Sequence, residues 1–196
     1  MPSDTRARLL DAAWTCIRNG GPTGATSRAI TAAADANLGA ITYYFGSKDA
    51  LVAEAVGAAI ETLIRPALDA LEDDAVDPAA RVFNAVAELQ RAHERAVDDA
   101  PVYLEVLTQS RRRPELAARI GQVFDEARSA LTTLMAGLQA NGVLPAWVEP
   151  ATMAGLLLAV AQGVVLQSTI DPGGPTLAAM ANQFARVLVA SRADQP

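Results

Sequence analysis

The sequence predicts an all-α protein, with three helices at the N-terminus followed by a larger helical body, about nine helices in all. Apolar residues recur at helical spacing along nearly the whole chain, and no stretch alternates apolar and polar residues as a half-buried β-strand does. The composition agrees, because alanine is abundant and aromatic residues make up only 5% of the 196 residues. A chain of this length can bury a core in one or two small domains.

The first three helices are predicted from local signals. A helix from Thr5 to Arg18 is followed by Asn-Gly-Gly, a typical helix end. In the stretch TSRAITAAADANLGAITYYFGSK, Thr26 is a typical N-cap for a second helix, and Asp35 tolerates the left-handed backbone of a sharp turn. Asn37 then caps a third helix of about two turns. This order predicts a helix-turn-helix motif.

The third of these helices has two different faces. Ile41 and Phe45 stand four residues apart and form an apolar inner face. A two-turn helix is too short to be stable alone, but it can read base edges in the major groove of DNA when its outer face is suited to them. The outer-face side chains are small, hydroxylated or aromatic, and all are uncharged: Leu38, Gly39, Thr42, Tyr43 and Tyr44.

Two groups of DNA contacts are expected from these positions. Hydroxyl groups, positive charges and helix N-termini are suited to phosphates, and the side chains concerned are Thr26, Ser27, Arg28, Tyr43 and Lys48. Base edges are expected to meet Asn37, Leu38, Gly39, Ala40, Thr42 and Tyr44. For Tyr43 the alternative is packing against the first helix with its hydroxyl outward.

The distribution of charged residues indicates that only the N-terminal part of the chain contacts DNA. The net charge is −6, yet residues 1–60 carry five basic and five acidic side chains. The excess acid therefore lies in residues 61–196, which carry eleven basic and seventeen acidic side chains. Because phosphates repel an acidic surface, DNA is expected to meet only the N-terminal part.

Residues 5–56 resemble the N-terminal DNA-binding region of TetR-type (TetR/AcrR family) transcriptional repressors. The matching segments are TRARLLDAAWTCIRNGG, ATSRAITAAADANLGAITYYF and GSKDALV, in the family's order and spacing. Asp35 stands where the family's turn usually has glycine. Thr42 and Tyr44 occupy positions that often hold tyrosine and histidine. These departures put the operator sequence in doubt rather than DNA binding.

The resemblance implies a division of labour along the chain. Residues 1–48 are then the DNA-binding domain, and residues 49–196 are a helical effector-binding and dimerisation domain. It also implies a repressor: an effector bound in the body reshapes the fourth helix, spreads the two DNA-binding domains of a dimer and releases the DNA. Because two-fold symmetry in a protein is mirrored in its operator, the DNA site is expected to be an inverted repeat.

The body is predicted to be helical throughout. Ser47 caps a helix that continues until Pro66 ends or kinks it. Further helices are expected from Pro78, from Pro101 and from Glu115 to Ala140.

A run of 21 uncharged residues, Pro150–Ile170, is close to the length that spans a bilayer. Gln162 near its middle and the acidic flanks Glu149 and Asp171 speak against spanning. A helix this apolar is instead expected to be covered by its own core on one side and a second subunit on the other. The predicted dimer interface consists of two helices, 152–169 and 176–191.

A small, mostly apolar effector is expected between the middle helices of the body. The candidate lining residues are Phe83, Tyr103, Leu107, Phe124, Leu134, Met135 and Gln162. Tyr103 and Gln162 are the candidates for hydrogen bonds to it. The alternative is that these residues only fill the core, in which case the protein is a DNA-binding regulator without a small-molecule ligand.

The sequence predicts no enzyme, cofactor or metal site. His93 is the only histidine and Cys16 the only cysteine, and no catalytic, phosphate-binding or zinc motif is present. The single cysteine, interpreted as a small buried hydrophobic residue, excludes an internal disulfide, and no apolar leader opens the chain, so a cytoplasmic protein is expected. A helical interaction protein with no DNA role remains a third class; it would show no salt-dependent binding to duplex DNA.

Overall fold

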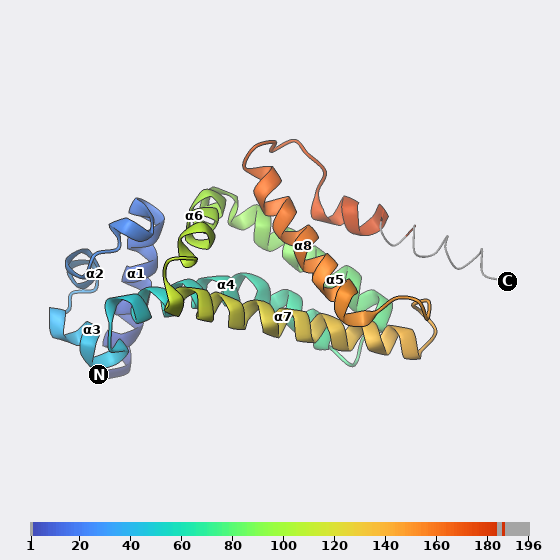
Figure 1. Ribbon diagram of the computed structural model, residues 1–196, viewed down its shortest axis with the longest axis horizontal. Helices are drawn as coiled ribbons and strands as arrows, with labels where there is room; N and C mark the ends of the chain where they lie inside the picture. Colours follow the sequence, from blue (N-terminus) through green and yellow to red (C-terminus); the bar gives the residue numbers. More distant parts are fainter. Residues whose placement is uncertain (1, 184–185, 187–196) are drawn as a thin grey trace. The chain divides into compact units, whose positions relative to one another are not determined.

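The computed structural model describes residues 2–183 and 186, and every regular element within them is helical (Figure 1). The all-α prediction is confirmed. The elements are α1 (Pro2–Gly24), α2 (Ser27–Ala33), α3 (Leu38–Phe45), α4 (Lys48–Glu72), α5 (Pro78–Arg95), a 3₁₀ turn (Val97–Asp99), α6 (Ala100–Ser110), α7 (Pro114–Ala140) and α8 (Pro150–Ser168). Residues 177–183 are helical as well, whereas 184–185 and 187–191 of the predicted last helix lie outside the described residues.

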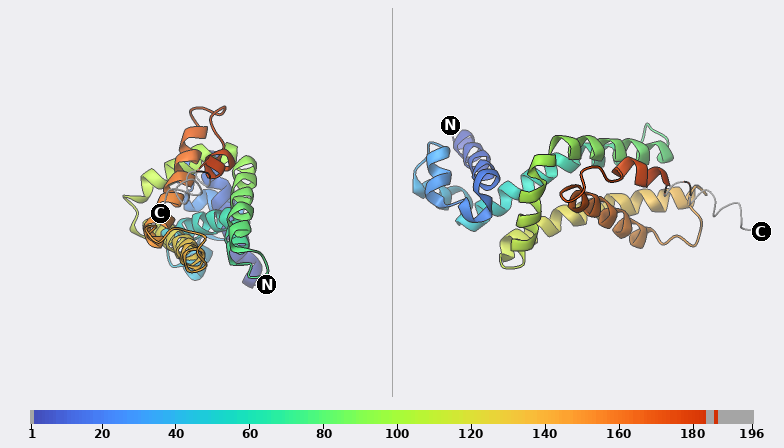
Figure 2. Two further views of the ribbon diagram at one scale, coloured as in Figure 1. Left: turned by 90° about the vertical axis from the view of Figure 1, so that its right-hand side faces the viewer. Right: turned by 90° about the horizontal axis from the view of Figure 1, so that it is seen from above.

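The chain packs as two compact units. Met1–Thr62 and Asp98–Val123 form the first, and Leu63–Val97 and Phe124–Pro196 form the second. The long helices α4 and α7 therefore each contribute residues to both units, and Figure 2 shows these two helices from two further directions. The predicted boundary at residue 48 separates a DNA-binding domain from an effector-binding and dimerisation domain, and it stays a prediction.

In the first unit, α1 contacts α2, α3 and α6. Leu9, Ala13 and Ile17 of α1 are fully buried, as is Ile30 of α2. Leu9, Ala13 and Ile17 recur at intervals of four residues, so they form one apolar face on α1. Burial of this face holds α1, α2 and α3 together, although α2 and α3 are too short to be stable alone.

The turn between α2 and α3 is a Schellman motif. The amide of Asp35 donates to the carbonyl of Ala32 at 3.4 Å, and the amide of Ala36 donates to the carbonyl of Thr31 at 3.0 Å. Asp35 has φ of 48°, the one positive φ at a non-glycine residue among those described. The left-handed turn residue expected at Asp35 is confirmed.

The sequence predicted that Pro66 ends or kinks the fourth helix, and the first of these outcomes is wrong. The helix does not end at Pro66 but continues to Glu72. An internal proline removes a backbone hydrogen bond and costs roughly 3 kcal/mol. The burial of Ala67, Leu68 and Leu71, which follow it and join the core of the second unit, offsets that cost.

The second unit is built around a single apolar cluster, to which α4, α5, α7 and α8 contribute. The C-terminal end of α7 is a second Schellman motif, in which Gly142 takes φ of 67°. The buried members of the apolar cluster are Ala67, Leu68, Leu71, Ala85, Ala127, Leu134, Met135, Leu138, Leu144, Val148 and Met153.

Only part of α8 packs against this core. Met153, Ala154 and Val164 are buried, whereas Leu156 and Leu166 are each 48% exposed. Glu149 caps the helix, and its carboxylate accepts hydrogen bonds from the amides of Ala151 and Thr152. Within the described part of the chain, α8 is the one helix whose length and composition would suit a membrane span, a test that an apolar interface helix also passes.

Candidate DNA-binding site

The helix α3 is fixed at both ends and on one side. At its start the Asn37 side-chain oxygen accepts a hydrogen bond from the amide of Ala40 at 2.9 Å. At its end Gly46 takes φ of 76°, and its amide donates to the carbonyl of Thr42 at 3.0 Å. The predicted inner face is confirmed at Ile41, which is 3% exposed, while Phe45 is half-buried.

The opposite face of α3 is open. Leu38 is 54% exposed and Tyr43 is 80% exposed, while Gly39 and Thr42 are also exposed. The Tyr43 ring meets the ring of Tyr44 edge to face, with 4.8 Å between centroids. Tyr43 therefore does not pack against α1, and its ring is supported by its neighbour instead. An uncharged, exposed surface of this kind can approach base edges without repelling phosphates.

The residues predicted to contact phosphates differ in how far their polar groups are engaged within the protein. Thr26 caps α2, and its oxygen accepts from the amide of Ala29 at 3.2 Å, which leaves its hydroxyl proton free to donate. Arg28 is exposed and forms no ion pair among the described residues. Lys48 lies 3.3 Å from the carboxylate of Asp49, so its charge is partly compensated in the absence of DNA.

The capping role of Asn37 limits the chemistry of its side chain. Its oxygen must face the amide of Ala40, because a backbone N–H can bond only to an acceptor. The side-chain NH₂ group is then the part left to meet DNA. Asn37 can donate to an acceptor, such as purine N7 or guanine O6, but it cannot form the two-bond contact with adenine that needs both of its ends.

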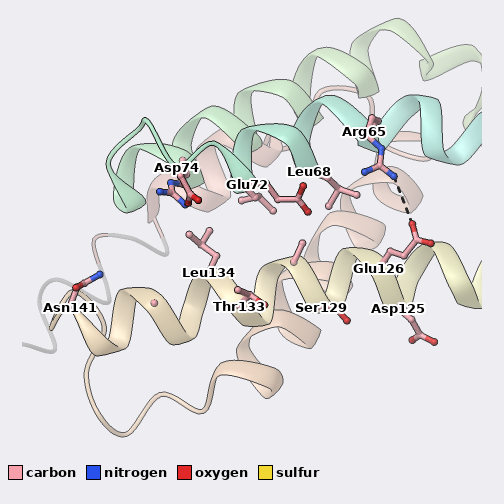
Figure 3. Close-up of a pocket in the computed structure, with 14 residues that line it drawn as sticks. Arg65, Leu68, Glu72, Asp74, Asp125, Glu126, Ser129, Thr133, Leu134 and Asn141 are labelled. Atoms are coloured by element: carbon pink, nitrogen blue, oxygen red, sulfur yellow. Dashed lines mark hydrogen bonds and ion pairs between the residues drawn. The ribbon is translucent and has the colours of Figure 1, made fainter.

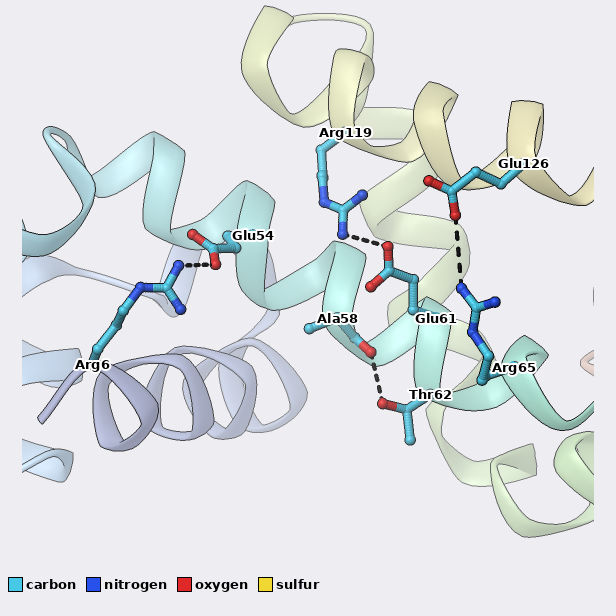
Figure 4. A network of polar contacts seen from close by, with 8 residues as sticks. All are labelled: Arg6, Glu54, Ala58, Glu61, Thr62, Arg65, Arg119 and Glu126. Atoms are coloured by element: carbon cyan, nitrogen blue, oxygen red, sulfur yellow. Dashed lines mark hydrogen bonds and ion pairs between the residues drawn. The ribbon is translucent and has the colours of Figure 1, made fainter. Parts of the chain in front are cut away.

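One positioning residue of the site is not evident from the sequence. Arg6 of α1 pairs with Glu54 of α4 (Figure 4). The Arg6 guanidinium also lies 5.0 Å from the centroid of the Phe45 ring. It therefore connects the first helix, the end of α3 and the fourth helix. Arg6 and Glu54 are 48 residues apart, and no local pattern reports such a pair.

The residues predicted to hold an effector are divided between the two units. Tyr103 and Leu107 belong to the first unit, where burial raises the pKa of the Tyr103 phenol to about 12, so that it is a hydrogen-bond donor at neutral pH. In the second unit Phe83 is 51% exposed and Leu134 and Met135 are buried in the core. The remaining candidates, Phe124 and Gln162, are half-buried there.

A cavity of about 930 Å³ lies in the second unit between α4 and α7 (Figure 3). Leu134 is the one predicted effector residue that lines it. Leu68 and Leu71 add to its apolar wall, whereas Glu72 and Asp125 give it a polar edge. Its lining is thus more polar than the sequence suggested.

Cys16 is half-buried, so it is less buried than the sequence predicted. The burial it does have raises the pKa of the thiol and therefore makes the reactive thiolate scarce at neutral pH.

Comparison with known proteins agrees with this geometry. A family model described as "Bacterial regulatory proteins, tetR family" matches residues 9–55, and one described as "BetI-type transcriptional repressor, C-terminal" matches residues 78–192. The HTH-type transcriptional regulator PksA of Bacillus subtilis (strain 168) is 25% identical over 170 residues, which cover 85% of this chain and 80% of PksA.

Solved structures share the fold. The structure of a putative transcriptional regulator from Pseudomonas aeruginosa PAO1 has a TM-score of 0.76 and 24% identity, with 97% of this chain and 91% of that chain covered. SmeT, in its complex with triclosan, has a TM-score of 0.73 and 20% identity, with 95% and 90% covered. The chain therefore belongs to the tetR family of bacterial regulatory proteins, DNA-binding transcription regulators that are not enzymes.

Proposed function

We propose that this protein is a cytoplasmic repressor that binds an inverted-repeat operator as a homodimer and leaves it when a small effector binds. The single observation that carries the DNA-binding part is α3, whose capped, uncharged outer face is exposed. The alternative is a DNA-binding regulator whose body dimerises without sensing a ligand.

The DNA contacts fall into the two groups expected from the sequence. Phosphates meet Thr26, Ser27, Arg28, Tyr43 and Lys48, and base edges meet the outer face of α3 with Asn37. Exposure of Tyr43 and the free hydroxyl proton of Thr26 support this division.

Replacing Lys48 with Ala removes a phosphate contact. Binding to all duplex sequences should weaken alike, and the slope of log affinity against log salt should fall by about one unit. The matched control is Arg95→Ala, which removes an exposed cation from the second unit. Titrations at several salt concentrations give both slopes, and an unchanged slope for Lys48→Ala would remove this residue from the contact surface.

Replacing Asn37 with Ser separates its two roles. Serine caps a helix about as well as asparagine, so the free energy of unfolding should change by less than about 0.5 kcal/mol. The NH₂ donor is lost, so discrimination between the operator and one changed at the contacted base should fall by roughly 1–3 kcal/mol. Competition binding checks this, with Asn84→Ser on α5 as the control. Full discrimination in Asn37→Ser would show that Asn37 only caps α3.

The proposed dimer interface is the exposed stripe of α8, with the last helix beside it. Successive members of the stripe are separated by three, four or seven residues, the spacing of a helix–helix seam. Its exposed members are Thr152, Leu156, Ala159 and Leu166. Large apolar patches left open on a monomer typically mark an interface.

Charge placed in this stripe should give folded monomers. Leu156→Glu and Leu166→Glu are the sharper variants, because Leu158 packs against the core of its own unit and Val165 is half-buried. Gln167→Glu adds the same charge at an exposed polar position and should leave the dimer intact. Sedimentation, together with circular dichroism, reports mass and folding. Dimers that persist in both leucine variants would show that the interface lies elsewhere.

Symmetry of the operator tests the main proposal. The two α3 helices of a dimer should enter successive major grooves, roughly 34–36 Å apart or a multiple of it. Footprinting on the DNA that flanks the protein's own gene should show protection with two-fold symmetry. Protection of one asymmetric half-site by a monomer would contradict the proposal.

The proposed effector is a small, mostly apolar molecule held in the body. The complex of SmeT with triclosan shows that a protein of the same fold holds a small molecule, and the 930 Å³ cavity offers this chain room for one. The lining carries charges of both signs, Arg65 and Arg81 as well as Glu72 and Asp125, which favours an effector that also carries hydrogen-bonding groups.

Effector and operator must be coupled reciprocally. Compounds that raise the melting temperature of the protein should weaken its binding to the operator, and the operator should weaken their binding by the same factor. Leu134→Ala tests the cavity and Leu107→Ala tests the residues of the first unit. A compound that binds tightly and leaves operator affinity unchanged is not the effector, and a broad compound set with only such binders would favour the regulator without a ligand.

A further inference from the structure

Gly57 lies in the interior of α4, with Arg119 of α7 across it. A β-carbon built at residue 57 would stand 2.5 Å from Nε, 2.7 Å from Cγ and 3.0 Å from Cζ of Arg119. Real β-carbons essentially never come so close to another heavy atom. The arginine side chain therefore occupies the space that any other residue at position 57 would need.

Arg119 is also paired. Its Nη2 atom lies 2.5 Å from Oε1 of Glu61, one turn further along α4 (Figure 4). Both side chains are mostly buried, with 25% of the arginine and 30% of the glutamate exposed. The contact uses the fork of the guanidinium, since Nε faces Gly57 while Nη2 meets Glu61. A lysine cannot make both contacts.

Gly57 and Glu61, which contact Arg119, stand on α4, the helix that follows α3 in the sequence. A further contact joins α4 and α7 nearer to α3, where the Ser47 hydroxyl lies 3.3 Å from a carboxylate oxygen of Glu115. Ser47 also caps α4, since its oxygen accepts from the amide of Ala50 at 2.9 Å. Gly46 and Ser47 alone separate α3 from α4. All of these residues belong to the first unit.

We propose that Arg119 is a positioning residue for DNA binding: seated on Gly57 and paired with Glu61, it holds the first half of α4, and thereby α3, in the orientation that meets DNA. The proposal rests on the proposed DNA contacts of α3. An interior glycine costs about 1 kcal/mol relative to alanine. Its use here is to let the arginine approach the helix backbone.

The first test replaces Arg119 with Ala and measures operator affinity against salt. Affinity should fall roughly tenfold, the loss of about one charge-assisted contact, while the salt slope stays unchanged because Arg119 touches no phosphate. Arg128→Ala is the matched control, because Arg128 stands on the same helix and, among the described residues, forms an ion pair only with its exposed neighbour Asp125. Wild-type affinity in Arg119→Ala, or a slope lowered as in Lys48→Ala, would overturn the proposal.

The second test is a double-mutant cycle with Gly57→Ala. The added methyl group should displace the guanidinium, so Gly57→Ala alone should lower operator affinity about as much as Arg119→Ala. In the Arg119→Ala background the methyl group meets open space, so the double variant should bind no worse than Arg119→Ala. Losses that simply add would show that the two residues act independently and would contradict the proposal.

Hydrogen exchange separates this proposal from the proposed function. In the protein without DNA, amides of α3 should exchange faster in Arg119→Ala than in the wild type, while those of α8 should be unchanged. Failure of the wild type to bind any duplex would refute the proposed DNA contacts, whatever the exchange rates show. Unchanged exchange in α3 would refute the role of Arg119, even where the wild type binds DNA.

Discussion

The helix α3, which we propose faces the DNA, is too short to be stable alone. An eight-residue helix is unstable in water, so α3 depends on Ile41, on its cap at Asn37 and on the left-handed Gly46. Ile41 packs on the side of the helix away from its exposed face, and Asn37 and Gly46 act at the two helix ends. The outer face is thereby free of structural duty, which is why it can carry uncharged residues selected for contact with bases. The arrangement of α1, α2 and α4 follows from the need to support it.

An acidic protein can bind DNA when its charges are separated along the chain. The excess acid lies beyond residue 60. In the first unit two basic groups are engaged within the protein, since Arg6 pairs with Glu54 and Arg18 with Asp99. Arg28 is left exposed without an ion pair among the described residues. Affinity then relies on few phosphate contacts, so hydroxyl groups and helix N-termini carry a larger share of them.

Local features were predicted well from the sequence because they follow local rules. The caps at Thr26 and Asn37 and the left-handed turn at Asp35 depend on residues within one helical turn, and the structure confirms all three. Pro66 was misjudged in part, because its effect depends on how much apolar surface follows it, which a local rule does not weigh.

Features that depend on distant contacts were not predictable. The pairing of Arg6 with Glu54 and the seat of Arg119 on Gly57 join residues far apart in sequence. Helical spacing also cannot separate pocket residues from core residues, since both face inward; Met135 is a member of the core cluster, whereas the cavity is lined by charged residues that look like surface positions in the sequence.

The central claim is that α3 and the start of α4 meet DNA, and Lys48 allows a direct measurement. It is the only lysine in the sequence, so an amine-reactive reagent modifies this side chain and the N-terminus alone. The rate of modification can be followed by peptide mass, with and without saturating operator duplex. We predict that the duplex slows the reaction at Lys48 strongly, because a phosphate then occupies its amine. Equal rates at Lys48 in the free and fully bound protein would contradict the claim.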